Sequence, residues 1–294
     1  MMSRAAFKIP AAVLLATVLA SCGSSSNPNS GSGAAVGGFG RCDVAAAPTS
    51  AHLAVSADDT LTLAGVLPRP IYFEGTSVDT INGGYEYCLV ANIAQRAGLR
   101  NLRLTNTSFD ALVAGRMTGY DLAAGEIFAT PERAQHVNFS ASYYHSATGV
   151  MVRSGTDLTA ETLRNVKIGV FLGSIQDGWV RNTLKPKTPA RTYESTVDMF
   201  TALQASQVDA VLVDAEIELP AAASSHGKTG VIAQIPALGG DYSLVLPMGS
   251  SNTEPVNRIL AAMKQDGTLD QLSQRWLLPA FGGVDPTALP NWSY

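Results

Sequence analysis

Residues 167–176, KIGVFLGSIQ, and residues 197–214, VDMFTALQASQVDAVLVD, decide the fold. Residues 167–171 and 209–213 are short apolar runs of the kind that form buried strands, whereas residues 197–205 place apolar side chains at helical spacing. Strands that alternate with helices at this pace indicate parallel sheets that are flanked by helices.

The same alternation extends in both directions from this stretch. We expect strands within residues 53–66, 102–104, 120–124, 150–152 and 243–246, and helices over 85–97, 109–114, 158–163, 255–264 and 269–276, with one more helix opened by Thr130 and Pro131. The chain has 294 residues, of which 46% are hydrophobic and 15% charged, so it can bury one large core or two modest ones. The sequence therefore predicts an α/β protein in which two lobes are allowed.

Charge and motifs exclude several classes of function. The net charge of -4 comes from interspersed charges without a basic run, so no nucleic-acid partner is expected. The sequence contains no glycine-rich phosphate loop of the P-loop type and no histidine pair at metal-ligand spacing. We therefore expect neither a metal nor a cofactor.

The first 21 residues have the features of a secretory signal peptide. Arg4 and Lys8 precede an apolar stretch, residues 9–20, which is shorter than the roughly 20 residues that cross a membrane. The segment ends in LASCG, residues 19–23, which resembles a bacterial lipobox in which Cys22 is acylated. The alternative is an ordinary cleaved signal with an incidental cysteine. The first interpretation predicts an exported protein anchored by lipid to a membrane, facing the periplasm or the cell exterior.

A flexible tether is expected to follow Cys22. Residues 23–40 consist mostly of Ser, Gly, Asn, Pro and Ala, a composition that cannot bury enough apolar surface to fold, and we place the linker at 22–50. Cys42 and Cys88 would lie in an oxidising compartment and could pair, or one could be buried and the other free. The sequence leaves both alternatives open.

Arg133 is the first candidate for a ligand-binding residue. It lies in the first turn of the helix expected after Pro131, where the helix dipole disfavours a cation by about 0.3 to 1 kcal/mol. A guanidinium can bind a ligand carboxylate through two parallel hydrogen bonds, which would offset that cost. The alternative is a surface ion pair with Glu132 or Asp121.

Asp214 is the second candidate. It follows the apolar run at 210–213 and so lies at the carboxyl end of a buried strand, where ligands bind in open α/β sheets. A buried carboxylate needs a partner, and a ligand ammonium would supply one. The alternative role is that of N-cap for the segment that follows.

Weaker signals surround these two residues. The strand at 167–171 runs into a small-residue turn and a helix start, where the backbone N–H groups of Ser174 and Ile175 could bind the same carboxylate as Arg133. Phe109, at the start of a helix, could form a flat apolar wall for the ligand or simply belong to the core.

Taken together, these segments resemble the family-3 extracellular solute-binding proteins, the polar amino-acid-binding proteins of bacterial ABC importers. The resemblance covers about residues 61–278, and the matching blocks occur at 84–86, 108–112, 120–125, 130–133, 137–140, 143–144, 173–174, 208–211, 214, 266–269 and 276.

The resemblance implies a type 2 periplasmic-binding-protein fold, with two lobes that close on a ligand. It places one lobe at 51–146 plus 240–294 and the other at 147–239. By the same likeness Arg133 would bind the ligand carboxylate with help from the N–H groups of Ser174 and Ile175, Asp214 would bind the ammonium, and Phe109 would stack on the ligand side chain. The partners implied are a small polar, amino-acid-like ligand and an ABC permease, and the protein is expected to be a monomer.

Four departures from the family pattern concern specificity. Phe128 stands where a Ser or Thr usually contacts the carboxylate, and Glu126 where a small residue is usual. Pro68 replaces a common aromatic clamp, and Cys88 replaces an acid of the first helix. Glu126 could favour a ligand with a second cationic group or many hydroxyls, or it could pair with Arg133 and weaken carboxylate binding.

Two rival functions remain on the same fold. The family resembles cyclohexadienyl dehydratases, in which case Glu126 would be a general acid. A sensory module that presents its closed form to a partner is the other alternative.

Overall fold

The computed structural model describes residues 38–44 and 49–294, and these residues form one compact unit. The predicted signal peptide, the lipidation site at Cys22 and most of the tether lie outside the described residues. The strands are β1 (Thr60–Val66), β2 (Asn101–Thr107), β3 (Leu122–Ala124), β4 (Asn138–Arg153), β5 (Ile168–Phe171), β6 (Arg191–Tyr193), β7 (Ala210–Leu212) and β8 (Thr229–Leu246). The α-helices are α1 (Tyr85–Arg96), α2 (Phe109–Val113), α3 (Ile175–Trp179), α4 (Thr196–Gln204), α5 (Ala215–Ser224), α6 (Thr253–Gln265) and α7 (Thr268–Leu272).

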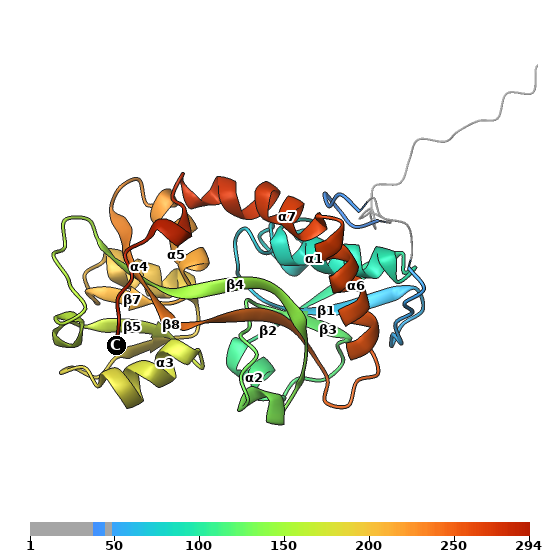
Figure 1. The fold of residues 1–294 in the computed structure, drawn as a ribbon, viewed down its shortest axis with the longest axis horizontal. Coiled ribbons are helices and arrows are strands. Elements are labelled where there is room, and N and C mark those ends of the chain that lie inside the picture. The colour runs from blue at the N-terminus through green and yellow to red at the C-terminus, as the bar shows by residue number, and fades with distance from the viewer. Residues whose placement is uncertain (1–37, 45–48) are drawn as a thin grey trace, which may run out of the picture. The chain divides into compact units, whose positions relative to one another are not determined.

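The described strands form one sheet of eight, in the order β2-β1-β3-β8-β4-β7-β5-β6. At one end β1 pairs in parallel with β2 and β3, and at the other β5 pairs in parallel with β6 and β7. The long strands β4 and β8 pair with each other in antiparallel fashion and run from one end to the other (Figure 1). We call the part with β1, β2 and β3 the first lobe and the part with β5, β6 and β7 the second lobe. The predicted α/β two-lobed fold class is confirmed.

Helices cover both lobes, and their ends follow the sequence signals. α1 is buried along almost its whole length and ends before Gly98, whose φ of +80° suits the left-handed conformation of a helix terminus. In the second lobe a separate hydrophobic cluster forms around Val150, Ile168, Val170 and Leu212. The apolar runs quoted above therefore form a buried core, as their pattern predicts.

β4 and β8 are much longer than expected. The sequence predicts strands only at 150–152 and 243–246, but the structure has 16 residues in β4 and 18 in β8. The middle parts of both strands include many exposed and half-buried positions, because they pass between the lobes instead of through a core. The middle of β4 is largely polar, and the middle of β8 contains Pro236, Gly239 and Gly240, so neither has the uninterrupted apolar pattern of a buried strand.

Two predicted helices are wrong. The segment after Thr130 forms only a 3₁₀ turn, Arg133–Gln135, because the chain enters β4 at Asn138. The hydroxyl of Thr130 nevertheless accepts a hydrogen bond from Arg133 N at 3.2 Å, as an N-cap would. The helix expected at 158–163 is likewise reduced to a 3₁₀ turn, Leu163–Asn165.

The C-terminal segment lies on the second lobe. Gln234 of β8 accepts a hydrogen bond from Trp292 N and donates its own N–H to Pro290 O, both at 2.8 Å. The ring of Tyr294 packs edge-on against Trp179, with 5.0 Å between ring centroids. The prediction that all of 240–294 belongs with the first lobe therefore needs correction at its end, because the chain crosses between the lobes again after α7. The other lobe boundaries stay a prediction.

Cys42 and Cys88 form a disulfide, with 5.1 Å between their Cα atoms. Of the two alternatives left open by the sequence, the structure has the bridge, which attaches the start of the described chain to α1. Within residues 38–44 and 49–294, no helix is long and apolar enough to cross a membrane, and no group of three or more His, Cys, Asp or Glu side chains is arranged to hold a metal ion.

Candidate functional site

A small cavity between the lobes brings the predicted site residues together. Its lining includes Phe109, Glu126, Phe128 and Arg133 from the first-lobe side and Ser174, Ile175 and Asp214 from the second. The remaining lining residues are Arg69, Gly125, Phe171, Gln176, Val213 and Ile217. The free volume is about 10 Å³, close to what one water molecule needs. The lining side chains, which include the charged groups of Arg69, Glu126, Arg133 and Asp214, leave almost no free space in this cavity.

Arg133 spans the gap between the two lobes. Its Nη1 donates to the carbonyl of Phe128 at 2.8 Å, and its Nη2 donates to the carbonyl of Gly173 in the second lobe at 3.1 Å. The guanidinium carbon lies 5.2 Å from the centroid of the Phe109 ring, within reach of a cation–π interaction. Burial lowers the pKa of Arg133 to about 10, and the charge of Asp214 opposes that shift. Arg133 is therefore a cation held at the lobe interface.

The alternative for Arg133, a surface ion pair, is not what the structure shows. Asp121 instead accepts hydrogen bonds from the backbone N–H groups of Thr62 and Ser56. Arg133 itself is only 7% exposed, so its charge faces the cavity region and not bulk solvent.

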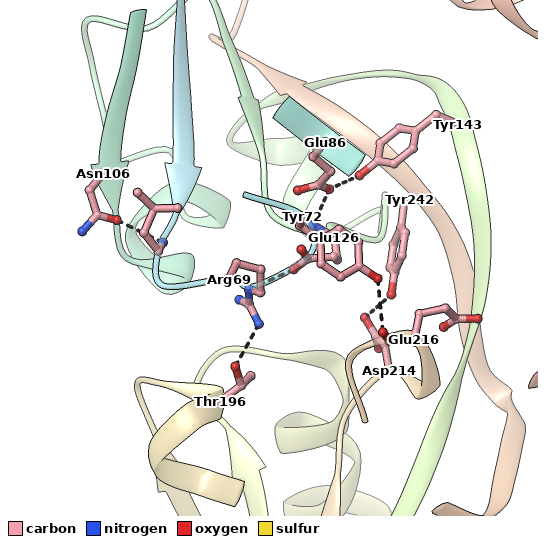
Figure 2. Close-up of polar contacts among 11 residues, drawn as sticks. Arg69, Tyr72, Glu86, Asn106, Glu126, Tyr143, Thr196, Asp214, Glu216 and Tyr242 are labelled. Atoms are coloured by element: carbon pink, nitrogen blue, oxygen red, sulfur yellow. Dashed lines mark hydrogen bonds and ion pairs between the residues drawn. The ribbon is translucent and has the colours of Figure 1, made fainter. Parts of the chain in front are cut away.

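Asp214 occupies the N-cap position of α5 but makes no side-chain cap hydrogen bond. Its Oδ2 accepts a hydrogen bond from the Tyr242 hydroxyl at 2.8 Å, and its Oδ1 accepts one from Gln176 Nε2 at 2.7 Å. Burial raises the pKa of Asp214 to about 6, although these hydrogen bonds and the charges of Arg69 and Arg133 oppose the rise. The carboxyl group is thus positioned in the cavity by side chains, as Figure 2 shows for Tyr242.

Glu126 pairs with Arg69 and not with Arg133. Arg69 Nε lies 3.1 Å from Glu126 Oε2, and the two side chains are 3% and 1% exposed. This contact resolves the question that the sequence left open about the partner of Glu126. Figure 2 shows both side chains reaching into the space between the lobes.

Sequence reasoning missed Arg69. The residue follows the carboxyl end of β1, where parallel sheets bind ligands, and that position was the available signal. Its neighbour Pro68, expected to replace an aromatic clamp, lines a separate surface groove and not this cavity.

A second buried acid supports the loop that carries Glu126. Glu126 has a positive φ of 51°, and its N–H donates to Glu86 Oε1 at 2.8 Å. Glu86 also accepts a hydrogen bond from the Tyr143 hydroxyl. Burial raises the pKa of both Glu86 and Glu126, and the charge of Arg69 opposes both shifts. Neither carboxylate oxygen of Glu126 has a hydrogen-bond partner among the described residues.

The turn at the start of α3 differs from expectation in one detail. The Ser174 hydroxyl caps α3 by accepting a hydrogen bond from Asp177 N at 3.1 Å, and the Ser174 N–H donates to Phe171 O at 3.1 Å. That N–H is therefore engaged, which leaves the carboxylate-binding role predicted for this turn to the N–H of Ile175.

Phe128 contributes packing and a carbonyl. Its ring stacks on Tyr242 with 5.1 Å between centroids, and its carbonyl accepts the hydrogen bond from Arg133. Phe128 therefore binds Arg133 directly through its backbone carbonyl. Its ring supports Tyr242, which in turn binds Asp214.

Two α/β lobes joined by long crossover strands, with a charged cavity between them, define a solute-binding protein of the two-lobed periplasmic type. The chain belongs to the bacterial extracellular solute-binding proteins, family 3, whose sequence profile matches residues 70–279.

Several relatives are similar over most of the chain. The L-cystine-binding protein TcyJ of Escherichia coli (strain K12) is 27% identical over 220 residues, which cover 73% of this chain and 80% of that protein. ABC transporter arginine-binding protein 1 of the same strain is 26% identical over 178 residues, or 58% of this chain and 72% of that protein. Among solved structures, an ancestral arginine-binding protein bound to arginine matches with a TM-score of 0.66 and 25% identity, covering 74% of this chain and 98% of that one.

Proposed function

We propose that the protein captures a small zwitterionic solute, an amino acid or a derivative, by closing its two lobes, and delivers it to the permease of an ABC importer. The observation that carries the proposal is that Arg133 and Asp214, a cation and a carboxylate from opposite lobes, line one cavity. The similarity to an L-cystine-binding protein and to an arginine-binding protein supports this ligand class.

In this proposal each charge of the ligand meets its opposite. The ligand carboxylate binds the Arg133 guanidinium through charge-assisted hydrogen bonds, and the N–H of Ile175 assists. The ligand ammonium binds Asp214, whose orientation Tyr242 and Gln176 already fix. Because the two partners belong to different lobes, a zwitterion stabilises the closed arrangement more than the open one.

Entry of a ligand requires movement. The free volume of about 10 Å³ is far too small for any amino acid, so the lobes must separate and side chains must rearrange before binding. β4 and β8 are the connecting segments about which such a motion would occur.

A thermal-shift and calorimetry panel of amino acids, polyamines, opines and small organic acids tests the proposal. A true ligand at about 100 times its dissociation constant adds about 2.7 kcal/mol of stability. For a body of this size, the melting temperature should rise by roughly 5 to 10 °C. Arg133→Ala and Asp214→Asn should each abolish this shift, whereas Arg100→Ala, which removes an exposed arginine paired with Asp59, should not. Wild-type affinity in Arg133→Ala, or no shift with any compound, would contradict the proposal.

One observation keeps an enzymatic alternative on the same fold. Glu126 is buried in the cavity with a raised pKa, which is what a general acid needs. A dehydratase of the cyclohexadienyl type would turn over prephenate, and Glu126→Gln would abolish that turnover. Absence of turnover in the wild-type protein excludes this alternative.

We also propose that the protein is exported, is anchored to a membrane through acylated Cys22, and works there as a monomer on the tether of residues 22–50. The family as a whole is extracellular, which supports export. The lipobox-like sequence at residues 19–23 supports the anchor.

A further inference from the structure

Arg69 is a buried cation that the zwitterion assignment does not use. It belongs to the first lobe, yet its guanidinium carbon lies 5.0 Å from the Phe171 ring centroid, and its Nη1 reaches Thr196 Oγ1 at 3.5 Å. Both of these neighbours belong to the second lobe. Arg69 therefore crosses the cavity and occupies space between Glu126 and the opposite wall.

Glu126, the ion-pair partner of Arg69, is poorly satisfied by the protein. Its side chain is 1% exposed, and neither of its oxygens accepts a hydrogen bond from any described residue. A buried carboxylate ordinarily accepts several hydrogen bonds, because an unmet acceptor costs free energy. Asp214, in the same cavity, has two well-aligned donors. Glu126 thus retains acceptor capacity directed toward the cavity, which a ligand donor can use.

A second cavity offers Arg69 another position. It has a volume of about 300 Å³ and shares two wall residues, Arg69 and Ile217, with the first cavity. Its lining is largely apolar, with Tyr72 and Phe200 among its residues, but it also contains the buried carboxyl of Glu216. Because Arg69 lines both cavities, a rotation about its side-chain torsions would carry the guanidinium toward this space, where the carboxyl group of Glu216 is an alternative hydrogen-bond acceptor.

We propose that Glu126 recognises a second cationic group on the ligand, and that Arg69 is an internal substitute for that group, which the ligand displaces toward the second cavity. The inference rests on the proposed function and narrows it. The ligand class is an α-amino acid with an ammonium or guanidinium on its side chain.

Charge complementarity favours this ligand class. With Arg69 in place, the cavity lining has two cations, Arg69 and Arg133, and two carboxyl groups, Glu126 and Asp214. Once Arg69 moves away, one cation and two carboxyl groups remain. A ligand with one carboxylate and two cationic groups matches that set, whereas a neutral side chain would leave Glu126 buried without a partner.

Displacement of Arg69 has a measurable consequence. A ligand that must compete with an internal cation binds more weakly than the same ligand would to a cavity without one, because only the fraction of molecules with Arg69 displaced is competent. Removing the Arg69 side chain should therefore tighten binding of a cationic amino acid. It should not tighten binding of a neutral analogue, which gains nothing from an exposed Glu126.

Calorimetry with two matched ligand pairs tests this inference. L-lysine is compared with L-norleucine, and L-arginine with L-citrulline, on the wild-type protein, Arg69→Ala and Glu126→Gln. The cationic-to-neutral affinity ratio should rise about 10-fold or more in Arg69→Ala and fall roughly 10- to 100-fold in Glu126→Gln. Arg100→Ala and Glu161→Gln, two exposed positions, are the matched controls and should leave the ratio unchanged. The double variant Arg69→Met with Glu126→Gln serves if a single change prevents folding, and it should not prefer the cationic member of either pair.

Three outcomes separate this inference from the proposed function. If amino acids bind but Glu126→Gln leaves the ratio unchanged, or Arg69→Ala lowers it, the role of Glu126 and Arg69 is refuted while amino-acid capture stands. If Arg69→Ala and Glu126→Gln lower the affinity for the cationic and the neutral member of each ligand pair equally, the Arg69–Glu126 ion pair has only a structural role and the inference is refuted. If neither the wild-type protein nor Arg69→Ala binds any amino acid, both ideas are refuted.

Discussion

The hydroxyl of Tyr242 donates a hydrogen bond to Asp214 Oδ2 across 2.8 Å, which links a crossover strand to the candidate ligand site. Tyr242 belongs to β8, which connects the two lobes, whereas Asp214 precedes α5 in the second lobe. The orientation of the carboxylate therefore depends on the strand about which the lobes would move.

Binding of a neutral amino acid should strengthen as pH rises from 5 to 7. Asp214 must be ionised to bind an ammonium, and burial raises its pKa to about 6 in the ligand-free protein. At pH 5 only about one tenth of the molecules would be ionised there, so affinity should be about 10-fold weaker than at pH 7. Calorimetry with a zwitterionic ligand from pH 5 to 8 measures the midpoint.

Tyr242→Phe provides the control for this pH dependence. The hydroxyl stabilises the ionised carboxylate, so its removal should move the midpoint upward by about one pH unit. Affinity that is constant from pH 5 to 8, or a midpoint that moves downward in Tyr242→Phe, would contradict the role of Asp214.

Stability should fall as pH rises from about 5 to 8, partly through Glu216. Burial raises the pKa of Glu216 from 4.5 to about 7, so the native state holds this proton more firmly than the unfolded chain does. The contribution is complete below about pH 4.5 and is lost as pH rises through 7, and it amounts to on the order of 3 kcal/mol. The raised pKa of Asp214, about 6, should lower the free energy of unfolding with rising pH in the same way, over a slightly lower pH range.

Urea unfolding at pH 5 and pH 8 measures this loss. Glu216→Gln keeps a neutral group that the Ser146 hydroxyl can still contact, so the variant should lose less stability between the two pH values than the wild type. An equal loss in both proteins would show that Glu216 does not titrate in this range.

The Cys42–Cys88 disulfide should stabilise the fold. It closes a loop with a sequence separation of 46, for which chain entropy predicts about 4 kcal/mol, with about 2 to 4 kcal/mol typical of measured cases. Cys42→Ser should lower the free energy of unfolding by about that amount. A reducing agent should lower the melting temperature of the wild type and leave that of Cys42→Ser unchanged. The same effect of the reductant on both proteins would argue against the bridge.

Acylation of Cys22 predicts how the protein fractionates. In a bacterial host the wild-type chain should sediment with membranes and partition into detergent, because two or more acyl chains give stable anchoring. Cys22→Ser should appear in the soluble fraction with the same ligand affinity. If the wild-type chain is soluble, the signal peptide is an ordinary cleaved one.

The local pattern of the sequence predicted most of the buried elements. The cores of β5, β7, α1, α4 and α6 lie where apolar periodicity placed them, because burial on one face of an element imposes that period directly on the chain. Arg133 and Asp214 were found for a related reason. Asp214 follows the apolar run of β7, and Arg133 follows the helix-start signal of Thr130 and Pro131, although only a 3₁₀ turn forms there.

What the sequence did not predict depends on contacts between distant segments. The middle of β4 is largely polar and that of β8 is interrupted by Pro236 and two glycines, so only their pairing with each other reveals them as strands. The sequence could not identify the partner of Glu126, because Arg69, Arg133 and a cationic group on the ligand all carry the positive charge that this carboxylate needs.

The sequence by itself determined the α/β class, which follows from local periodicity, and the family, which follows from motif blocks at fixed spacing; it also singled out Arg133 and Asp214, which line the cavity. The tertiary structure alone decided that Arg69 fills part of that space and pairs with Glu126. The physical reason is that an ion pair is selected by distance and desolvation, and neither quantity exists until the chain has folded.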